Sequence, residues 1–298
     1  MSGVVESDRL GKRYGGKWAL RDCTLSIPEG RVVGLVGPNG AGKTTLLHLA
    51  VGLLRPSAGS ITVLDATPAA GPAALARVGF LAQDSPAYAR LTVEQHLQMG
   101  RWLNPGWDED FASARVNELG LDRRQHAESL SGGQRAQLAL TLAVAKRPEL
   151  LILDEPVASL DPLARREFLQ TLMDVVARGG VTVLMSSHLV ADLERICDYF
   201  IVLVASQVAL AEDVDDMLTS HLRLTGPRRG ASTFPAGLTV IEESHTERQS
   251  TFIVRGRGPV ADPVWTVSPV VLDDLVLAYM KQARDSRSTP PTELKVAG

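Results

Sequence analysis

The segment of residues 37–44 constrains the fold of this chain more than any other. Its sequence, GPNGAGKT, fits the pattern G-x-x-x-x-G-K-[ST], and it lies between an apolar, β-branched run at 31–36 and leucines at helical spacing at 44–54. In this context the glycines let successive backbone N–H groups point at phosphate oxygens, and the positive end of the helix faces the same anion. The pattern predicts a nucleotide-binding loop between a strand and a helix, rather than a glycine-rich turn without a ligand.

The side chains of the loop extend this prediction. Lys43 supplies a positive charge for the β- and γ-phosphates, Thr44 offers its hydroxyl to Mg²⁺, and Thr45 bonds a further phosphate. The predicted cofactor-binding residues of the loop are Gly37, Pro38, Asn39, Gly40, Ala41, Gly42, Lys43, Thr44 and Thr45.

Two adjacent acids end a second apolar run, at residues 150–153. A carboxylate at the end of a buried strand is costly unless a cation or hydrogen bonds compensate its charge. In a protein with a phosphate-binding loop that cation is Mg²⁺, so Asp154 is predicted to be the carboxylate on the metal side. Glu155 would face the γ-phosphate and act as the general base that polarises the attacking water. The pair would otherwise cap the next helix, but the loop at 37–44 favours the catalytic interpretation.

Short apolar runs alternate with amphipathic stretches over the first part of the chain, and 181–185 is a third candidate strand. Continuous apolar strands separated by helices are typical of a parallel sheet covered on both faces, so an α/β core is predicted. Residues 87–148 are predicted to form a helical insertion in this core, with Thr92 as the N-cap of its first helix.

A second unit is predicted beyond a boundary near Ser220, where a small α+β appendage begins. Its predicted elements are a loop at 226–230, two strands at 238–241 and 251–254, and a helix at 272–284. The polar residues that follow, with two adjacent prolines, are predicted to be disordered. We therefore expect an ATPase domain over 1–218, a small accessory domain over 219–284 and a disordered tail over 285–298.

The composition narrows the classes of function. Lys and Arg number 31 against 34 Asp and Glu, a net charge of −3 with no basic stripe, so no nucleic-acid partner is expected. The two cysteines, Cys23 and Cys197, have no CxxC spacing and are expected to be reduced, buried thiols. No apolar run approaches the roughly 20 residues of a membrane-spanning helix, and the N-terminus has no secretory pattern, so a cytoplasmic location is expected.

Residues 130–135, with the sequence LSGGQR, form a second small-residue turn that opens a helix. In this form, and at about twenty residues before Asp154, the turn resembles the signature motif of the ATP-binding subunits of ABC transporters. The resemblance extends from residue 1 to about 215 and implies a P-loop NTPase (RecA-like) core with an antiparallel N-terminal β region. It also implies a head-to-tail dimer that encloses two ATP molecules, in which the signature residues of one copy complete the site of the other; these are Ser131, Gly132, Gly133 and Gln134.

The resemblance assigns roles to four further residues. Tyr14 matches the aromatic residue that stacks on adenine, and Gln83 matches the glutamine that joins the core to the helical insertion and senses Mg²⁺ and the γ-phosphate. Asp161 matches the loop that crosses the dimer interface, and His188 matches the histidine that contacts the γ-phosphate. Taken alone, each would more often be a packing, loop or polar residue. The predicted sets are Lys43, Gln83, Glu155 and His188 for catalysis, and Thr44, Gln83 and Asp154 for the metal.

Two turns depart from the family pattern. Asp65, and the pair at 205–206, stand where glycine is usual. These departures are expected to affect turn geometry and to leave the chemistry untouched.

The resemblance implies that ATP and Mg²⁺ are the cofactors and that hydrolysis drives transport through a separate membrane permease. The permease is expected to dock near 84–92 and to hold the cassette at the inner face of the cell membrane. The complete set of motifs favours a homodimer over pairing with a paralogous cassette. The appendage, and the acidic-apolar run at 271–277, are similar to those of cassettes in bacterial drug, antibiotic or polymer exporters, so export is expected.

Other functions stay open at this point. An importer cassette with a regulatory C-terminal part is one alternative. A soluble ABC ATPase that acts on ribosomes or DNA is another, although such proteins usually pair two cassettes on one chain or carry a long coiled coil or a basic linker. A binding module without turnover is a third, and Glu155 argues against it because such a module needs no general base. The cargo is not encoded in recognisable residues of this chain.

Overall fold

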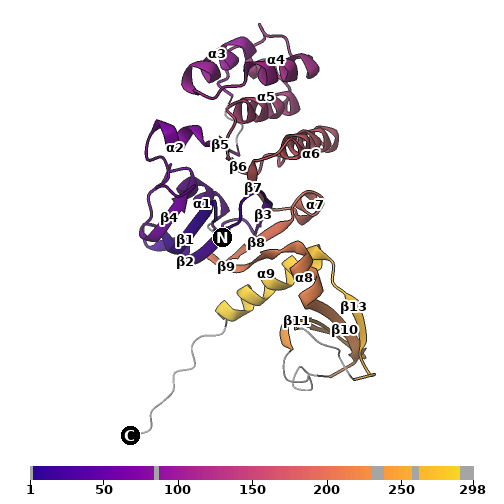
Figure 1. The fold of residues 1–298 in the computed structure, drawn as a ribbon. Helices are drawn as coiled ribbons and strands as arrows, with labels where there is room; N and C mark the ends of the chain where they lie inside the picture. The colour runs from indigo at the N-terminus through magenta and orange to yellow at the C-terminus, as the bar shows by residue number, and fades with distance from the viewer. Residues whose placement is uncertain (1–2, 84–86, 230–237, 257–261, 289–298) are drawn as a thin grey trace.

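The structure is a computed structural model that describes residues 3–83, 87–229, 238–256 and 262–288, the last five of these by their backbone (Figure 1). A helical bundle lies at one end of a central sheet, and a smaller sheet lies at the other end. None of the helices within the described ranges combines the length and the apolar character that a membrane-spanning segment needs. The segment 84–92, predicted to dock a permease, is described only from residue 87.

The central sheet holds six strands in the order β5-β6-β7-β3-β8-β9. Its first five strands run parallel, and β9 pairs antiparallel with β8. Because parallel strands end at a common edge, the segments that follow β3, β6 and β7 lie near one another. The α/β core is thus confirmed, and the strand bounds are β3 Val32–Val36, β5 Val78–Leu81, β6 Leu150–Leu153, β7 Thr182–Ser187, β8 Tyr199–Val204 and β9 Gln207–Asp213.

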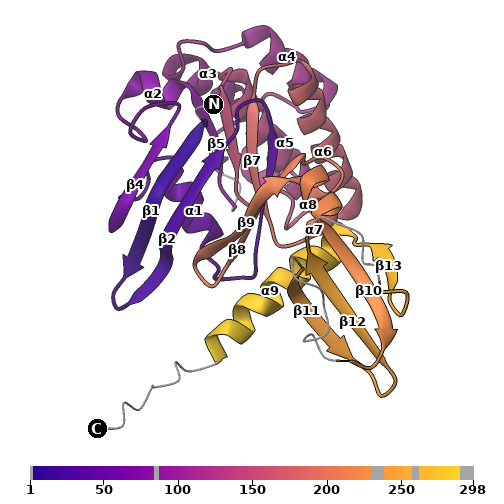
Figure 2. The same cartoon turned by 60° about the horizontal axis from the view of Figure 1, so that its bottom comes forward.

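A three-stranded antiparallel sheet, in the order β2-β1-β4, confirms the antiparallel N-terminal β region (Figure 2). Its strands are β1 Val5–Tyr14, β2 Lys17–Ile27 and β4 Ala58–Val63. Helix α1 (Lys43–Ala50) shares one hydrophobic cluster with this sheet and with β3. The helix is shorter than the stretch 44–54 predicted for it, because Gly52 turns the chain with φ +76°, a left-handed conformation that favours glycine.

The predicted helical insertion is confirmed as a bundle of three α-helices, with a 3₁₀ turn between the second and the third. Thr92 is the N-cap of the first helix, as predicted, and it forms a capping box with Gln95. Helix α5 packs against the other two and also against α6 (Pro162–Ala177), so it joins the bundle to the core. The bundle consists of α3 Val93–Leu103, α4 Glu109–Glu118, the 3₁₀ turn η1 Ala127–Ser129 and α5 Gly132–Ala145; the short α2 Pro72–Ala76 precedes it.

A four-stranded antiparallel sheet follows helix α8 (Val214–Ser220), in the order β11-β12-β10-β13. Helix α9 (Leu272–Ser288) closes this part of the chain, so an α+β appendage is present beyond Ser220. The two strands predicted at 238–241 and 251–254 are confirmed as β11 and β12. The strands are β10 His221–Pro227, β11 Thr239–His245, β12 Gln249–Arg255 and β13 Thr266–Pro269.

Two predictions about the appendage are wrong. Gly226 and Pro227 belong to β10 and pair with Ser250 and Gln249, whereas a loop was predicted there. Gly226 serves packing, since a Cβ at this position would lie 2.7 Å from the ring of Trp265. Helix α9 continues through 285–288, which were predicted to be disordered, because the first proline comes only at 290. The rest of the predicted tail, 289–298, lies outside the described residues.

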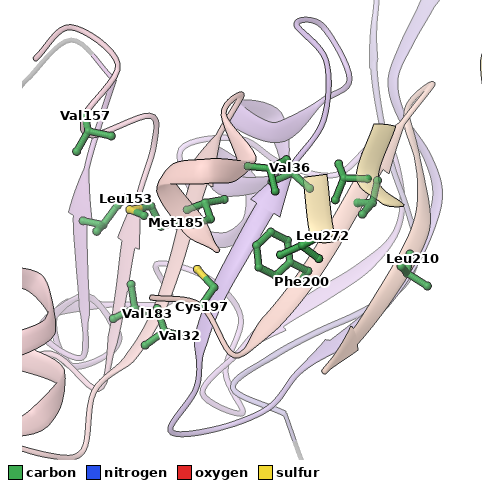
Figure 3. Close-up of a cluster of buried hydrophobic side chains, with 14 of the residues drawn as sticks. Val32, Val36, Leu153, Val157, Val183, Met185, Cys197, Phe200, Leu210 and Leu272 are labelled. Carbon is green, nitrogen blue, oxygen red and sulfur yellow. The ribbon is translucent and has the colours of Figure 1, made fainter. Parts of the chain in front are cut away.

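One hydrophobic cluster runs from the central sheet into the appendage (Figure 3). It joins Val36, Met185 and Phe200 of the core to Leu272 near the start of α9. Helix α9 contacts β8, β9 and the short helix α7 (Val190–Leu193), which directly follows the segment of His188. The helix is therefore part of the core of the cassette as well as of the appendage.

The turn at 205–206, where glycine is usual, adopts a left-handed backbone conformation with other residues. Ala205 and Ser206 have φ +56° and +71°, and both are thus in the left-handed region, as is Asp65 at φ +62°. The pair is fastened to β2, because the backbone of Ser206 accepts hydrogen bonds from the Arg21 N–H at 2.8 Å and from the Cys23 thiol at 3.3 Å. Cys23 and Cys197 are free and buried, as predicted, and burial raises the pKa of both thiols.

Candidate functional site

A cavity of about 400 Å³ opens at the edge of the central sheet where β3 ends. All predicted loop residues except Gly37 and Pro38 line it, and Gln83 and Glu155 line it from outside the loop. Ala19 of β2 also lines the cavity. This residue could not be predicted, because its contribution depends on how the N-terminal sheet lies beside the central one. The loop, Gln83 and the predicted base Glu155 thus face one cavity.

Glycine is required at two positions of the loop. A Cβ at Gly37 would lie 2.1 Å from the carbonyl oxygen of Leu203, and one at Gly42 would lie 2.4 Å from that of Ala19. Gly42 also has φ +110° and is the N-cap of α1, where it offers no side chain to the first N–H groups of the helix. These donors face the cavity and suit an anion such as a phosphate group.

Glu155 contacts two other titratable side chains of the site, Lys43 and His188. The Lys43 ammonium donates to the carbonyl oxygen of Gly37 at 2.8 Å, and its Nζ lies 3.4 Å from Oε1 of Glu155. The other oxygen of Glu155, Oε2, lies 2.8 Å from Nδ1 of His188. Lys43 and Glu155 are 7% and 8% exposed, whereas the side chain of His188 is 43% exposed. The carboxylate therefore lies between a buried cation and a histidine at the surface of the site.

Ser186, near the end of β7, forms hydrogen bonds with both predicted acids. Its hydroxyl donates to Oδ1 of Asp154 at 2.7 Å and accepts the backbone N–H of Glu155 at 2.8 Å. Glu155 has φ +48°, a conformation in which a non-glycine residue is strained, so this bond fixes an unfavourable backbone. Sequence reasoning missed the role of Ser186, because its partners lie on a different strand.

The donors beside the loop suit a divalent cation. Asp154 is 1% exposed, and within the described residues its Oδ2 is buried without a hydrogen-bond partner. A buried carboxylate oxygen in this condition is costly unless a cation binds it. Thr44 and Gln83 present a hydroxyl and an amide to the adjoining cavity, and oxygen donors of this kind are those that Mg²⁺ prefers. The residues present thus fit the predicted metal.

Tyr14 and Asp161, two further predicted site residues, are not among the residues that line this cavity. Tyr14 ends β1 and is 49% exposed, with the Lys12 ammonium 5.6 Å from its ring centre. Asp161 is the N-cap of α6, where Oδ1 accepts the N–H groups of Leu163 and Ala164, both at 3.0 Å. In this chain alone, Asp161 therefore serves as a helix cap.

The predicted signature residues form an exposed helix start. Ser131 is the N-cap of α5, and its hydroxyl accepts the N–H of Gln134 at 3.2 Å. The Gln134 side chain accepts the Ser131 N–H in return, at 3.0 Å. At Gly132 a Cβ would have no heavy atom within 4 Å, so this position is open to solvent. The turn presents its backbone and the positive end of a 14-residue helix at the surface, well suited to an anion from outside the chain.

Comparison with known proteins places this arrangement among ATP-binding cassettes. The family model for "ABC transporter" matches residues 20–158. The chain is 33% identical to the Nod factor export ATP-binding protein I of Cupriavidus pinatubonensis over 74% of its length and 70% of that protein. It is 34% identical to the thiamine import ATP-binding protein ThiQ of Salmonella choleraesuis over 66% of its length and 86% of that protein.

Solved structures agree with the fold. The structure of an ATP-binding subunit of an ABC transporter is similar with a TM-score of 0.65 and 29% identity, over 72% of this chain and 91% of that one. A dimeric ATP-binding cassette in a post-hydrolysis state, bound to ADP and phosphate, is similar with a TM-score of 0.63 and 23% identity, over 70% of this chain and 98% of that one.

Proposed function

The chain belongs to the ABC transporter family and is an ATPase cassette. We propose that two copies of it close head to tail around two ATP molecules. In this proposal, ATP hydrolysis drives export through a separate membrane permease. The observation that carries the proposal is the contact of Glu155 with both Lys43 and His188 beside a cavity lined by the phosphate-binding loop.

In the proposed reaction the chain positions reactants and stabilises charge, and it forms no covalent intermediate. Lys43 and the N–H groups at the start of α1 hold the β- and γ-phosphates. Glu155 accepts a proton from the attacking water, and His188 holds the carboxylate in place and reaches the γ-phosphate. Thr45 bonds a further phosphate, and Tyr14 stacks on adenine.

Mg²⁺ would be held by Thr44, Gln83 and Asp154. When bound, it would neutralise the negative charge of the phosphate groups. Ser186 fixes the orientation of Asp154 toward this position, because it already occupies Oδ1 and leaves Oδ2 for the cation.

The proposed dimer follows from the position of the signature residues. Ser131 to Gln134 lie outside the cavity of their own chain, yet they form an anion-binding helix start at the surface. Such a site is used if a second copy brings its nucleotide to it, with Asp161 at the interface. ATP binding would thereby be coupled to dimer closure, and charge repulsion after hydrolysis would let the copies part.

Export through a permease at the inner face of the membrane is the finer part of the proposal. The appendage supports it, since α9 begins with the acidic-apolar run at 271–277 that is similar to exporter cassettes. The export protein from Cupriavidus matches a slightly larger share of this chain, 74%, than the thiamine importer, 66%. An importer cassette is the second candidate, favoured by the 34% identity to ThiQ.

The test of the dimer uses the Glu155→Gln variant, measured by size exclusion with light scattering, with and without Mg-free ATP. We expect a monomer that becomes a dimer when ATP is added. A variant that binds ATP and stays monomeric would contradict self-pairing and point to a paralogous cassette.

Transport direction needs the permease. The cassette would be tagged, purified with its membrane partner and reconstituted in vesicles with the cassette on the outside. ATP added outside should then move cargo into the vesicle lumen if the system exports. ATP-driven release of cargo loaded in the lumen would instead establish import.

A further inference from the structure

A groove of about 350 Å³ lies in the appendage and is lined by residues of one face of the four-stranded sheet and of helix α9. It is separate from the nucleotide cavity and shares no residue with it. Apart from Ile253 on the sheet and Leu277 on the helix, its lining is polar, with charged side chains on both sides. The pattern of these side chains follows from the register of the strands.

The first row of the groove carries opposite charges at its two ends. Ile253 of β12 pairs with Arg223 of β10 on one side and with Glu242 of β11 on the other. Since neighbouring strands are about 4.8 Å apart, the two charged residues are separated by about 10 Å. Helix α9 crosses this row, because Asp274 pairs with Arg223 and Lys281 pairs with Glu242. Asp274 and Lys281 are seven positions apart, which is about 10 Å along a helix. The distance between the two charged residues on α9 therefore matches the distance between Arg223 and Glu242 on the sheet.

The second row carries hydroxyl groups. Thr251 of β12 pairs with Thr225 on one side and with Ser244 on the other, two positions further along each strand and thus on the same face. All three line the groove. Within the described part of the chain no hydrogen bond engages their hydroxyl groups. The row therefore offers three free donors and acceptors beside the two charges.

The charges select the kind of ligand. Two cations and two carboxylates line the groove, so it is neutral overall and does not suit a polyanion such as a nucleotide. The side chains on the sheet are the more shielded ones, with Glu242 19% and Arg223 33% exposed against 39% for Asp274 and 61% for Lys281. Because shielded charges interact more strongly than exposed ones, Arg223 and Glu242 dominate recognition.

Both of these residues keep binding capacity beyond their ion pairs. Glu242 meets Lys281 through Oε1, which leaves Oε2 for a second donor. Arg223 meets Asp274 through one nitrogen of a guanidinium that has five N–H donors. A ligand can therefore bind both without breaking the contacts to α9.

We propose that this groove binds a short peptide with free termini, about three residues long. Its carboxylate binds Arg223, and its ammonium binds Glu242. An extended chain of three residues spans about 10 Å, which matches the separation of the two side chains. Its amide groups lie along Thr225, Thr251 and Ser244, whose hydroxyls donate to and accept from them.

The test is isothermal titration of the full chain with triglycine. Two ligands serve as controls, namely glycine, which is too short, and N-acetyl-triglycine amide, which lacks both charges. Glu242→Gln should weaken triglycine binding at least about tenfold, because it removes a charge-assisted hydrogen bond. The matched variant Glu243→Gln makes the same change at the next residue of β11. Glu243 pairs with Phe252 and lies on the opposite face of the sheet, so this variant should bind as the unaltered chain does.

A second variant keeps the ion pairs and the strand propensity. Thr251→Val removes the central hydroxyl while retaining a β-branched side chain, and it should weaken binding severalfold. The proposal is overturned if triglycine does not bind the unaltered chain, if the acetylated amide binds equally well, or if folded Thr251→Val and Glu242→Gln both retain full affinity.

Discussion

Oε1 of Glu155 lies 3.4 Å from Nζ of Lys43, and both side chains are buried. The residue assigned as base thus already neutralises the residue assigned to the γ-phosphate. In the proposed reaction, a γ-phosphate that binds Lys43 would compete with this contact and free the carboxylate for a water molecule, so that nucleotide binding would prepare the base.

Glu155→Gln should lower the turnover of ATP by about 10²–10⁴-fold, the range typical of a lost general base. ATP affinity should be kept, because the amide leaves Lys43 without a competing carboxylate. Phosphate release and nucleotide binding measured on the same preparation check both parts. Glu167→Gln, on the exposed face of α6, makes the same change away from the site and should be silent. Unchanged hydrolysis in Glu155→Gln would remove this residue as the base.

Ser186→Ala should lower turnover and raise the Mg²⁺ concentration needed for half-maximal activity severalfold. The change leaves the Glu155 N–H and Oδ1 of Asp154 without their shared hydroxyl, so about 1–3 kcal/mol of folding stability should also be lost. Ser187→Ala is the matched control, since that hydroxyl accepts the N–H of Leu189 and touches neither acid. A normal Mg²⁺ dependence in Ser186→Ala would rule out a positioning role.

Ser131→Arg, placed in the Glu155→Gln background, should prevent the ATP-dependent dimer and leave ATP binding to the monomer intact. The bulky cation fills the exposed turn that would receive the partner's nucleotide. Loss of the helix cap alone is tested by Ser131→Ala, which costs about 1 kcal/mol but adds no bulk. Dimerisation of the arginine variant, seen by light scattering, would show that the signature residues do not act across an interface.

The buried His221 should make the stability of the chain depend on pH. Nδ1 lies 2.7 Å from the carbonyl oxygen of Met217 and Nε2 lies 2.8 Å from the hydroxyl of Tyr279, so a neutral ring satisfies both contacts. Burial lowers the pKa of His221 from 6.5, and the charge of Arg255 adds to this, partly offset by Glu212 and the Met217 hydrogen bond.

Because the unfolded chain takes up the proton first, the stability contributed by His221 is complete above pH 6.5 and is lost as the pH falls through the lowered pKa. Denaturant unfolding at pH 7.5 and pH 5 should show a smaller loss in His221→Gln than in the unaltered chain. Equal losses in the two proteins would assign the acid sensitivity to carboxylates elsewhere.

Much of the catalytic edge could be predicted because its signals are local. The loop at 37–44 and the acids after β6 follow directly from apolar strands, so their positions are fixed by sequence spacing alone. The role of Ser186 could not be predicted, because its two hydrogen bonds join it to Glu155 and Asp154, which lie 31 and 32 positions earlier in the chain. A serine at the end of a buried strand carries no signal until the neighbouring strand is known.

The appendage was harder to predict for a similar reason. Which side chains of β10, β11 and β12 share a face depends on their register, and a bulge between Val240 and Glu242 shifts that register by one residue. Because of this shift, Glu242 pairs with Ile253 and lies in the same row as Arg223. The glycine and proline that end β10 predict a loop by their residue types, and their pairing with β12 cannot be read from the local sequence.

The packing of α9 determines where the chain can be cut. Phe200, Leu210 and Met217 of the cassette share a continuous apolar cluster with Leu272 and Val276 of this helix. A truncation at the predicted boundary near 218 would expose these side chains to solvent and leave an apolar, aggregation-prone surface on the fragment. The smallest piece of this protein that keeps its apolar surface covered therefore extends into the final helix, and limited proteolysis within the appendage would nick it without releasing a free cassette.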